Sequence, residues 1–214
     1  MIGAELAAWM QAALPTLAAA LVAAILAFIV GVAGATASSG VHPLLGGLLS
    51  RAAEMAGSLP TLLLLALVRT AHPAPGLALT ASVVGLLRGF ELAHTIRAHW
   101  MQLEATDFVL AARALGSGPR RIFRRELWPH LGPPAIAHAA LTAPALVGVD
   151  AALAALGLES DSGVSWGTLL GRAARTAAPG AALLPAAGAV ALVAALLSVA
   201  RRIDSIHETG RRFL

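Results

Sequence analysis

Long runs without a charged side chain constrain this sequence more than any other feature. Leu14–Ala35 and Gly180–Ala200 contain no charge, and Pro134–Leu158 contains a single Asp. A helix needs about 20 mostly apolar residues to cross the hydrocarbon core of a bilayer. Each of the three runs reaches that length, so the sequence predicts a protein whose helices span a membrane.

The composition narrows the fold class further. Charged residues make up 12% of the 214-residue chain, about half of the roughly 25% that is usual in soluble domains. Aromatic residues make up 4%, whereas a transmembrane barrel carries alternating strands and girdles of aromatic side chains. We therefore expect an all-α, polytopic membrane protein. Because the chain has no Cys, disulfides, thiolate nucleophiles and Cys-ligated metal sites are excluded.

Two further runs are weaker candidates for spans. Met55–Val68 is apolar but short, and it reaches spanning length only if residues from Arg51 onward extend its first turns. Gly76–Ala93 is interrupted by Arg88 and Glu91. The sequence thus predicts about five spans between an N-terminal tail (1–11) and a C-terminal tail (207–214); these spans are residues 14–35, 52–70, 76–96, 134–158 and 180–200.

The arginines indicate how these spans are oriented, because basic residues collect on the cytoplasmic side of membrane proteins. In the five-span topology eleven arginines fall on one side, Arg69, Arg172 and Arg175 fall on the other, and Arg88 lies within a span. We therefore expect the C-terminus and the loop at 106–130 to be cytoplasmic. This segregation favours a membrane over nucleic acid as the partner of the basic residues.

One long polar segment, Asp107–Pro134, separates the third and fourth predicted spans and reads DFVLAARALGSGPRRIFRRELWPHLGPP. Thr106 or Asp107 can cap a helix over FVLAARAL, and Gly116 suits its C-terminal end. Pro119 then favours the start of a second short helix, RRIFRREL. The first helix is amphipathic, and its apolar face consists of Phe108, Ala111, Ala112 and Leu115.

Physical chemistry alone leaves two interpretations of this segment open. An interfacial helix would rest its arginines on anionic lipid headgroups. A docking helix would place its apolar face in the groove of a partner protein, and the small Ala111-Ala112 pair would permit a close approach. Both interpretations place the segment at the cytoplasmic membrane surface.

The segment resembles the coupling loop, or EAA loop, of ABC importer permeases, in which Glu-Ala-Ala precedes a Gly and then Ile-x-Leu-Pro. Leu110-Ala111-Ala112, Gly116 and Glu126-Leu127-Trp128-Pro129 follow that pattern at its full spacing. Leu110 stands in place of the Glu, and Glu126 and Trp128 stand in place of the Ile and the Leu. Two alanines, the glycine and the proline therefore carry the resemblance.

Downstream residues are similar to one branch of that family, which imports dipeptides, oligopeptides or nickel. Leu153–Leu158 and Ser165-Trp166-Gly167 resemble the passage of that branch that leads to Ser-Trp-Gly, and Gly132–Pro134 resembles its entry to the next span. The resemblance covers roughly residues 12–206. This branch usually has an extra N-terminal span before these residues, so the resemblance implies either a minimal or a truncated member.

This resemblance implies an ABC importer. The chain would be a permease subunit with the type I importer core, and it would lie in the bacterial inner membrane. It would form half of a translocation pathway for peptides or a related small solute such as nickel. The implied partners are a second, different permease subunit, two ATPase subunits and an extracytoplasmic solute-binding protein. ATP and Mg²⁺ would bind to the ATPase subunits. No cofactor and no enzymatic activity are therefore expected in this chain, which has no G-x-x-x-x-G-K-[ST] motif.

Candidate site residues fall into two groups. The resemblance implies an ATPase-docking surface of Phe108, Ala111, Ala112, Arg113, Leu115, Gly116, Arg120, Arg121 and Pro129. Ionisable residues inside a membrane are costly and are candidates for a translocation pathway or its gate; here they are Arg88, Glu91, His138 and Asp150. The alternatives are that Arg88 and Glu91 pair or snorkel to the interface, and that Asp150 makes a hydrogen bond between helices. No metal site is expected.

Two rival functions stay open at this point. A structural or assembly protein with a basic lipid-binding loop would explain the arginines but not the matched spacing of Gly116 and Pro129. A permease for another solute class would share the coupling loop. A membrane enzyme is disfavoured because the chain contains no H-E-x-x-H or G-x-S-x-G motif.

Overall fold

The computed structural model describes residues 2–38, 51, 54–55, 60–72, 76–159, 163–176, 180, 183–192, 194–195 and 198. All regular structure in these residues is helical, which confirms the predicted all-α class. In chain order the elements are α1 (Ile2–Ser38), α3 (Thr61–Ala71), α4 (Leu77–Glu104), α5 (Asp107–Ala114), α6 (Pro119–Ile122), the π-helical turn η1 (Phe123–Leu127), α7 (Trp128–Ala140), α8 (Thr142–Ala155) and α9 (Trp166–Thr176).

Three helical stretches of the described residues are long and apolar enough to cross a membrane: Leu6–Ala37, Leu77–Glu104 and Pro119–Ala155. They contain or overlap the predicted spans at 14–35, 76–96 and 134–158. Thr61–Ala71 and Leu183–Leu192 are shorter apolar helices. The predicted spans at 52–70 and 180–200 lie partly outside the described residues, and the tail at 207–214 lies entirely outside them.

Two helix boundaries differ from the sequence-based expectation. The predicted N-terminal tail is part of α1, because its Ala, Leu and Met residues favour helix and Pro15 is tolerated inside a membrane helix. The helical stretch that contains most of the fourth predicted span begins at Pro119, so it also includes the predicted short helix RRIFRREL. This 37-residue stretch is about 55 Å long at 1.5 Å per residue, so its first turns extend beyond the roughly 30 Å hydrocarbon core.

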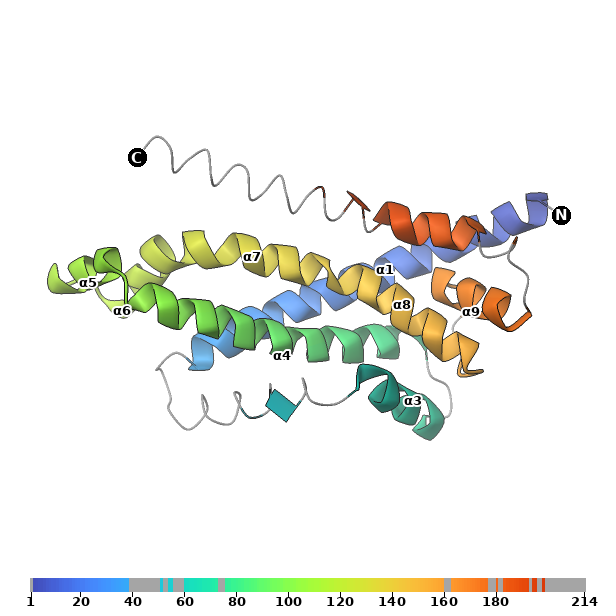
Figure 1. Cartoon of the computed structure of the whole chain (residues 1–214), viewed down its shortest axis with the longest axis horizontal. Coiled ribbons are helices and arrows are strands. Elements are labelled where there is room, and N and C mark those ends of the chain that lie inside the picture. The colour runs from blue at the N-terminus through green and yellow to red at the C-terminus, as the bar shows by residue number, and fades with distance from the viewer. Residues whose placement is uncertain are drawn as a thin grey trace.

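Helices α1 and α4 lie along each other for most of their length (Figure 1), and glycines allow the close approach. A Cβ atom on Gly85 would lie 2.7 Å from the Ala23 carbonyl oxygen, and one on Gly89 would lie 2.6 Å from Val30 Cβ. Small residues let the backbones of two membrane helices approach closely. Inside a bilayer such helices associate through van der Waals contacts, because the hydrophobic effect does not favour one apolar surface over lipid. Helices α1 and α4 thus form a closely packed pair in the bundle.

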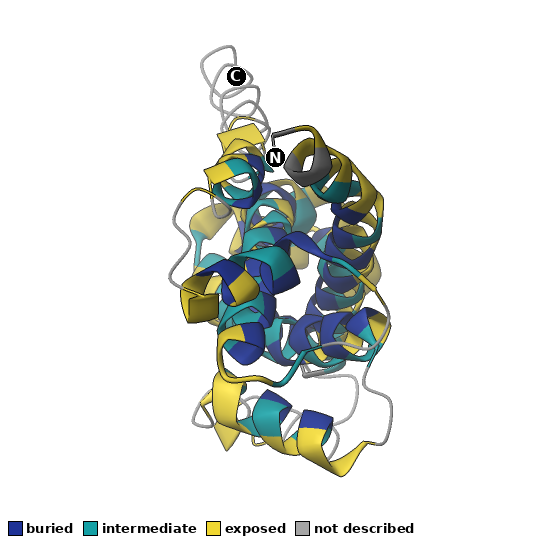
Figure 2. Cartoon of the chain, turned by 90° about the vertical axis from the view of Figure 1, so that its right-hand side faces the viewer, coloured by how far each residue is buried: buried dark blue, intermediate teal, exposed yellow. Residues whose placement is uncertain are grey.

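The core is divided along the bundle axis. One buried cluster, which includes Leu65, Val84 and Leu146, joins α1, α3, α4 and α8. A second, which includes Trp100 and Leu131, joins the other end of α4 to α6, η1 and α7. Figure 2 looks along the long axis and shows that the buried faces of the helices point inward and the exposed faces outward. Helices α5 and α9 lie at opposite ends of the bundle (Figure 1), which we call the α5 end and the α9 end.

Candidate functional site

Helix α5 is held at its end of the bundle by one buried side chain. Val109 is fully buried and belongs to the core cluster that also contains Trp100 and Ile122. The helix ends at Gly116, which has a φ of +78°, a backbone conformation that glycine adopts without the penalty of a Cβ atom. Gly116 N–H donates to the Arg113 carbonyl at 2.9 Å, and Ser117 N–H donates to the Ala112 carbonyl at 3.0 Å. These two bonds form a Schellman motif, as the sequence suggested for this glycine.

The predicted apolar face of α5 is divided by the fold. Phe108 is 39% exposed and Leu115 is 87% exposed, and Ala111 is exposed beside them. Ala112 instead packs partly against the core cluster. Val109, which no sequence pattern singled out, anchors the helix in the core. Its neighbour Phe108 stays partly exposed, with its ring 5.5 Å from the ring of His130 in α7.

Polar contacts at the start of α5 differ in detail from the expectation. Thr106 occupies the N-cap position, but its side chain makes no capping bond to the helix. Its hydroxyl donates to the Leu103 carbonyl at 2.5 Å instead. Arg113 Nη2 lies 2.6 Å from Glu104 Oε1 at the end of α4. This exposed pair and Val109 together set the angle between α5 and α4.

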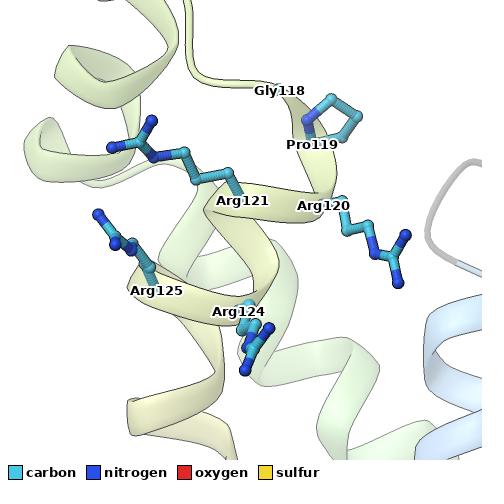
Figure 3. A pocket seen from close by; sticks show the side chains of 6 residues that line it. All are labelled: Gly118, Pro119, Arg120, Arg121, Arg124 and Arg125. Carbon is cyan, nitrogen blue, oxygen red and sulfur yellow. The ribbon is translucent and has the colours of Figure 1, made fainter.

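The basic part of the segment forms the turns that follow α5. Arg120, Arg121, Arg124 and Arg125 are exposed, whereas Ile122 between them and Leu127 after them are buried in the core cluster. The four arginines, with Gly118 and Pro119, line an open hollow of about 890 Å³ (Figure 3). Pro129 lies just after this hollow, exposed in the first turn of α7.

A polar stripe follows the face of α4 that is turned to α7. Arg88 Nη1 lies 2.8 Å from Glu91 Oε2, and Thr95 and His99 continue the stripe one and two turns further on. A groove of about 320 Å³ separates α4 from α7 there; its lining is mostly apolar, and its polar side chains are those of Thr95, His99 and His138. Arg88 and Glu91 lie within electrostatic range of His138. The fold thus brings together three of the four predicted pathway residues.

Asp150, the fourth predicted pathway residue, lies elsewhere, in a buried network near the α9 end. Arg69 Nη2 of α3 lies 2.6 Å from Asp150 Oδ1 of α8, and both side chains are at most 2% exposed. Arg69 also donates to Thr80 Oγ1 of α4 at 2.8 Å and to the Leu158 carbonyl at 2.5 Å. Ser165 Oγ donates to Asp150 Oδ2 at 2.5 Å. Both charged groups of this pair have further hydrogen-bond partners, which is the condition under which a buried ion pair is tolerated.

The sequence-based analysis did not predict the burial of Arg69. It placed this residue among the loop arginines that set orientation, whereas the structure buries it in the core. One signal could have revealed the pair: Asp150 lacks a cationic neighbour on its own helix, and a charge inside a membrane protein needs a partner. The choice among the 15 arginines depends on the packing of α3 against α8.

Helix α9 is fastened to the bundle by small residues and by tryptophans. Cβ atoms on Gly167 and Gly171 would overlap atoms of Asp150 and Ala154 in α8, so this G-x-x-x-G pair permits direct contact of the two helices. The indole of Trp166 stacks on Trp9 of α1, with ring centroids 5.5 Å apart. The Ser165-Trp166-Gly167 passage therefore joins α1, α8 and α9.

Comparisons with known proteins agree with this architecture. Residues 29–212 match the family described as binding-protein-dependent transport system inner membrane component. Over 128 residues the chain is 30% identical to proteins named as peptide permeases from Brucella ovis and from Brucella suis biovar 1. That match covers 59% of this chain and 42% of each relative, so the chain spans less than half of the length of the curated relatives that it matches. The family match covers most of the sequence, and the chain belongs to the binding-protein-dependent transport system inner membrane components.

Proposed function

We propose that this chain is the permease subunit of an ATP-driven importer and that α5 couples it to an ATPase subunit. The observation that carries the proposal is the exposed apolar face of α5 on a helix anchored to the core by Val109. A helix that is fixed on one side and apolar on the other suits a helix-in-groove contact. Such a helix also transmits motion, because a displacement of α5 is passed to α4, α6 and α7 through packed side chains.

The remaining parts of the importer follow from the family. A binding-protein-dependent component works with a solute-binding protein, and we place that protein at the α9 end and the ATPase subunits at the α5 end, on the cytoplasmic side. A second permease subunit would complete the pathway. ATP and Mg²⁺ would be held by the ATPase subunits. We propose peptides as the solute class, because the curated relatives are named as peptide permeases.

The docking proposal predicts that Leu115→Asp prevents the chain from copurifying with its ATPase subunit. Leu115 is the most exposed apolar side chain of α5, and a carboxylate there would be desolvated without a partner in an apolar groove. Pull-down of the ATPase through a tag on the chain measures the effect, and we expect at least a tenfold loss, which corresponds to about 1.4 kcal/mol.

The matched control is Leu110→Glu, on the same helix and also exposed, but on the opposite face. Leu110 occupies the position at which the coupling loop of the family carries Glu, so this variant should keep the ATPase bound. Equal recovery of the ATPase with Leu115→Asp and with the unchanged chain would overturn the assignment of α5 as the docking helix.

The stripe on α4 and His138 on α7 are proposed as part of the wall of the translocation pathway. Arg88 and Glu91 are partly exposed in the isolated chain, although they lie within a stretch that is long and apolar enough to cross a membrane. Charged side chains in such helices face a bundle interior or a water-filled cavity, not lipid. The α4–α7 groove would therefore face water and the second permease subunit.

Cysteine accessibility tests this wall, and the chain suits the method because it contains no native Cys. Thr95→Cys, in the groove, should react with a membrane-impermeant thiol reagent in the assembled transporter. Ile136→Cys provides the control: Ile136 is 41% exposed and lies on α7 close to His138, but does not line the groove, so it should face lipid and stay unlabelled. Labelling of Ile136→Cys but not of Thr95→Cys would contradict the proposed orientation.

A further inference from the structure

Four arginines at the start of the helical stretch Pro119–Ala155 lack an acidic partner within the described part of the chain. They are Arg120, Arg121, Arg124 and Arg125. Other described arginines are neutralised by carboxylates at short distance: Arg69 by Asp150, Arg88 by Glu91, Arg113 by Glu104, and Arg172 and Arg175 by Glu159. The four are therefore a cluster of positive charges that the described fold leaves without a counterion.

The fold holds these charges together although they repel. Arg120 and Arg124, like Arg121 and Arg125, are four residues apart, a spacing at which like charges destabilise a helix. Buried neighbours compensate: Ile122 is 4% exposed, and Phe123 stacks on Trp100 with ring centroids 4.9 Å apart. The turn η1 that carries Arg124 and Arg125 is π-helical, a geometry that is rare and is found frequently at functional sites.

The place of the arginines along the helix points to the membrane surface. They occupy the first two turns of a stretch that is apolar enough to cross a bilayer, and Trp128, an aromatic residue of the kind found at membrane interfaces, follows at once. We infer from this position that the arginines lie close to the membrane surface, within reach of lipid phosphates. The guanidinium fork matches the geometry of phosphate oxygens and binds them through paired hydrogen bonds.

The directions of the side chains favour lipid over a protein groove. Figure 3 shows that Arg121 and Arg125 point to one side of the turn, whereas Arg120 points away from them. A single docked protein would meet one side, but lipid headgroups surround a helix where it enters the membrane. The hollow of about 890 Å³ between the side chains is large enough for a headgroup.

We propose that this surface, the arginine hollow of residues Gly118–Arg125, binds the phosphate groups of anionic phospholipids. Their binding neutralises the four charges and keeps the first turns of the Pro119–Ala155 helix at the level of the headgroups. The resemblance assigns Arg120 and Arg121 to ATPase docking as well, so the proposal is tested on the full chain without its ATPase subunits.

Lipid retention by the purified full-length chain tests the proposal. The chain would be reconstituted in vesicles of phosphatidylglycerol and phosphatidylcholine, extracted in mild detergent, and analysed by native mass spectrometry for bound lipid. Phosphatidylglycerol should be retained over phosphatidylcholine. The double substitution Arg124→Gln and Arg125→Gln should reduce that retention on the order of tenfold, because each basic residue at an anionic surface contributes to binding.

Matched variants separate this site from general charge and from folding. The double substitution Arg172→Gln and Arg175→Gln removes the same charge from residues that are already paired with Glu159, and it should leave lipid retention unchanged. The double substitution Arg124→Lys and Arg125→Lys keeps the charge and replaces the Gln variant if that variant does not fold. It should lower lipid retention, because Lys cannot form the paired hydrogen bonds of a guanidinium group.

Three results would overturn the proposal. The first is equal retention of phosphatidylglycerol by the unchanged chain and the folded Gln variant. The second is displacement of the lipid by inorganic phosphate alone, which would indicate a site for a free anion. The third is a Gln variant that keeps its lipid but no longer copurifies with the ATPase, which would assign the arginines to the docking surface.

Discussion

Replacing Gly116 by Glu should reduce ATP-driven uptake to background while the chain still inserts into the membrane. Gly116 ends α5 with a φ of +78°, a conformation that costs an L-residue about 1–2 kcal/mol. A carboxylate at the C-terminal end of a helix is also repelled by the helix dipole. Both effects act at the end of the proposed docking helix. Apart from its sequence neighbours, no described residue comes within 4 Å of the place that a Cβ atom on Gly116 would occupy, so a clash within the chain does not explain the loss.

Uptake by proteoliposomes that contain the permease subunits, the ATPase subunits and the binding protein measures the effect, and immunoblotting of the membrane fraction measures insertion. Gly3→Glu is the control for the added charge, since Gly3 is exposed with equally open surroundings and lies in α1, away from α5. Gly116→Ala isolates backbone strain from charge and should retain part of the uptake. Normal uptake by Gly116→Glu would show that the end of α5 is not at the docking surface.

Replacing Asp150 by Ala should destabilise the protein by about 3–5 kcal/mol, the cost of removing one partner from a buried ion pair. Arg69 would then be buried without a counterion. Its remaining partners, Thr80 and the Leu158 carbonyl, accept hydrogen bonds but carry no negative charge. The network joins α3, α4, α8 and the residues before α9, so its loss should loosen the whole α9 end. Thermal unfolding of the purified chain in detergent, followed by circular dichroism, would show the decrease in Tm.

A double-mutant cycle identifies the pair as the cause. Arg69→Met combined with Asp150→Ala should cost less than the sum of the two single variants, because neither charge is then buried alone. Arg88→Met with Glu91→Ala is the reference pair: it is partly exposed and should contribute no more than about 1 kcal/mol. Equal destabilisation by Asp150→Ala and Glu91→Ala would contradict the buried network.

The same cycle tests the proposed gating role of Asp150. Its carboxylate does not line the α4–α7 groove, so a direct contact with solute would require the network to open. If the folded double variant keeps normal uptake, the network stabilises the fold and does not gate the pathway. A folded double variant with impaired uptake would support a gate at the α9 end.

Local signals in the sequence were sufficient for the helices and for the coupling segment. Uncharged runs such as Leu14–Ala35 require a membrane environment wherever they pack, because length and hydropathy decide spanning. The end of α5 was also predictable. Gly116 adopts a left-handed backbone conformation, which glycine favours without any help from distant residues. The structure joins the predicted helix RRIFRREL and the fourth predicted span in one helical stretch from Pro119, because arginines and glutamates favour helix as well as apolar residues do.

Only the tertiary structure decided which residues meet. Arg69 and Asp150 are 81 positions apart, and nothing near either residue specifies the other. Val109 and Phe108 are adjacent and equally apolar, yet one is buried against Trp100 and the other is partly exposed. The amphipathic period shows that a helix has two faces, but the packing of neighbouring helices decides which face is buried. The sequence by itself therefore determined the membrane helices and the short helix that we propose for docking, whereas long-range packing decided the ion pair, the groove and the anchor of α5.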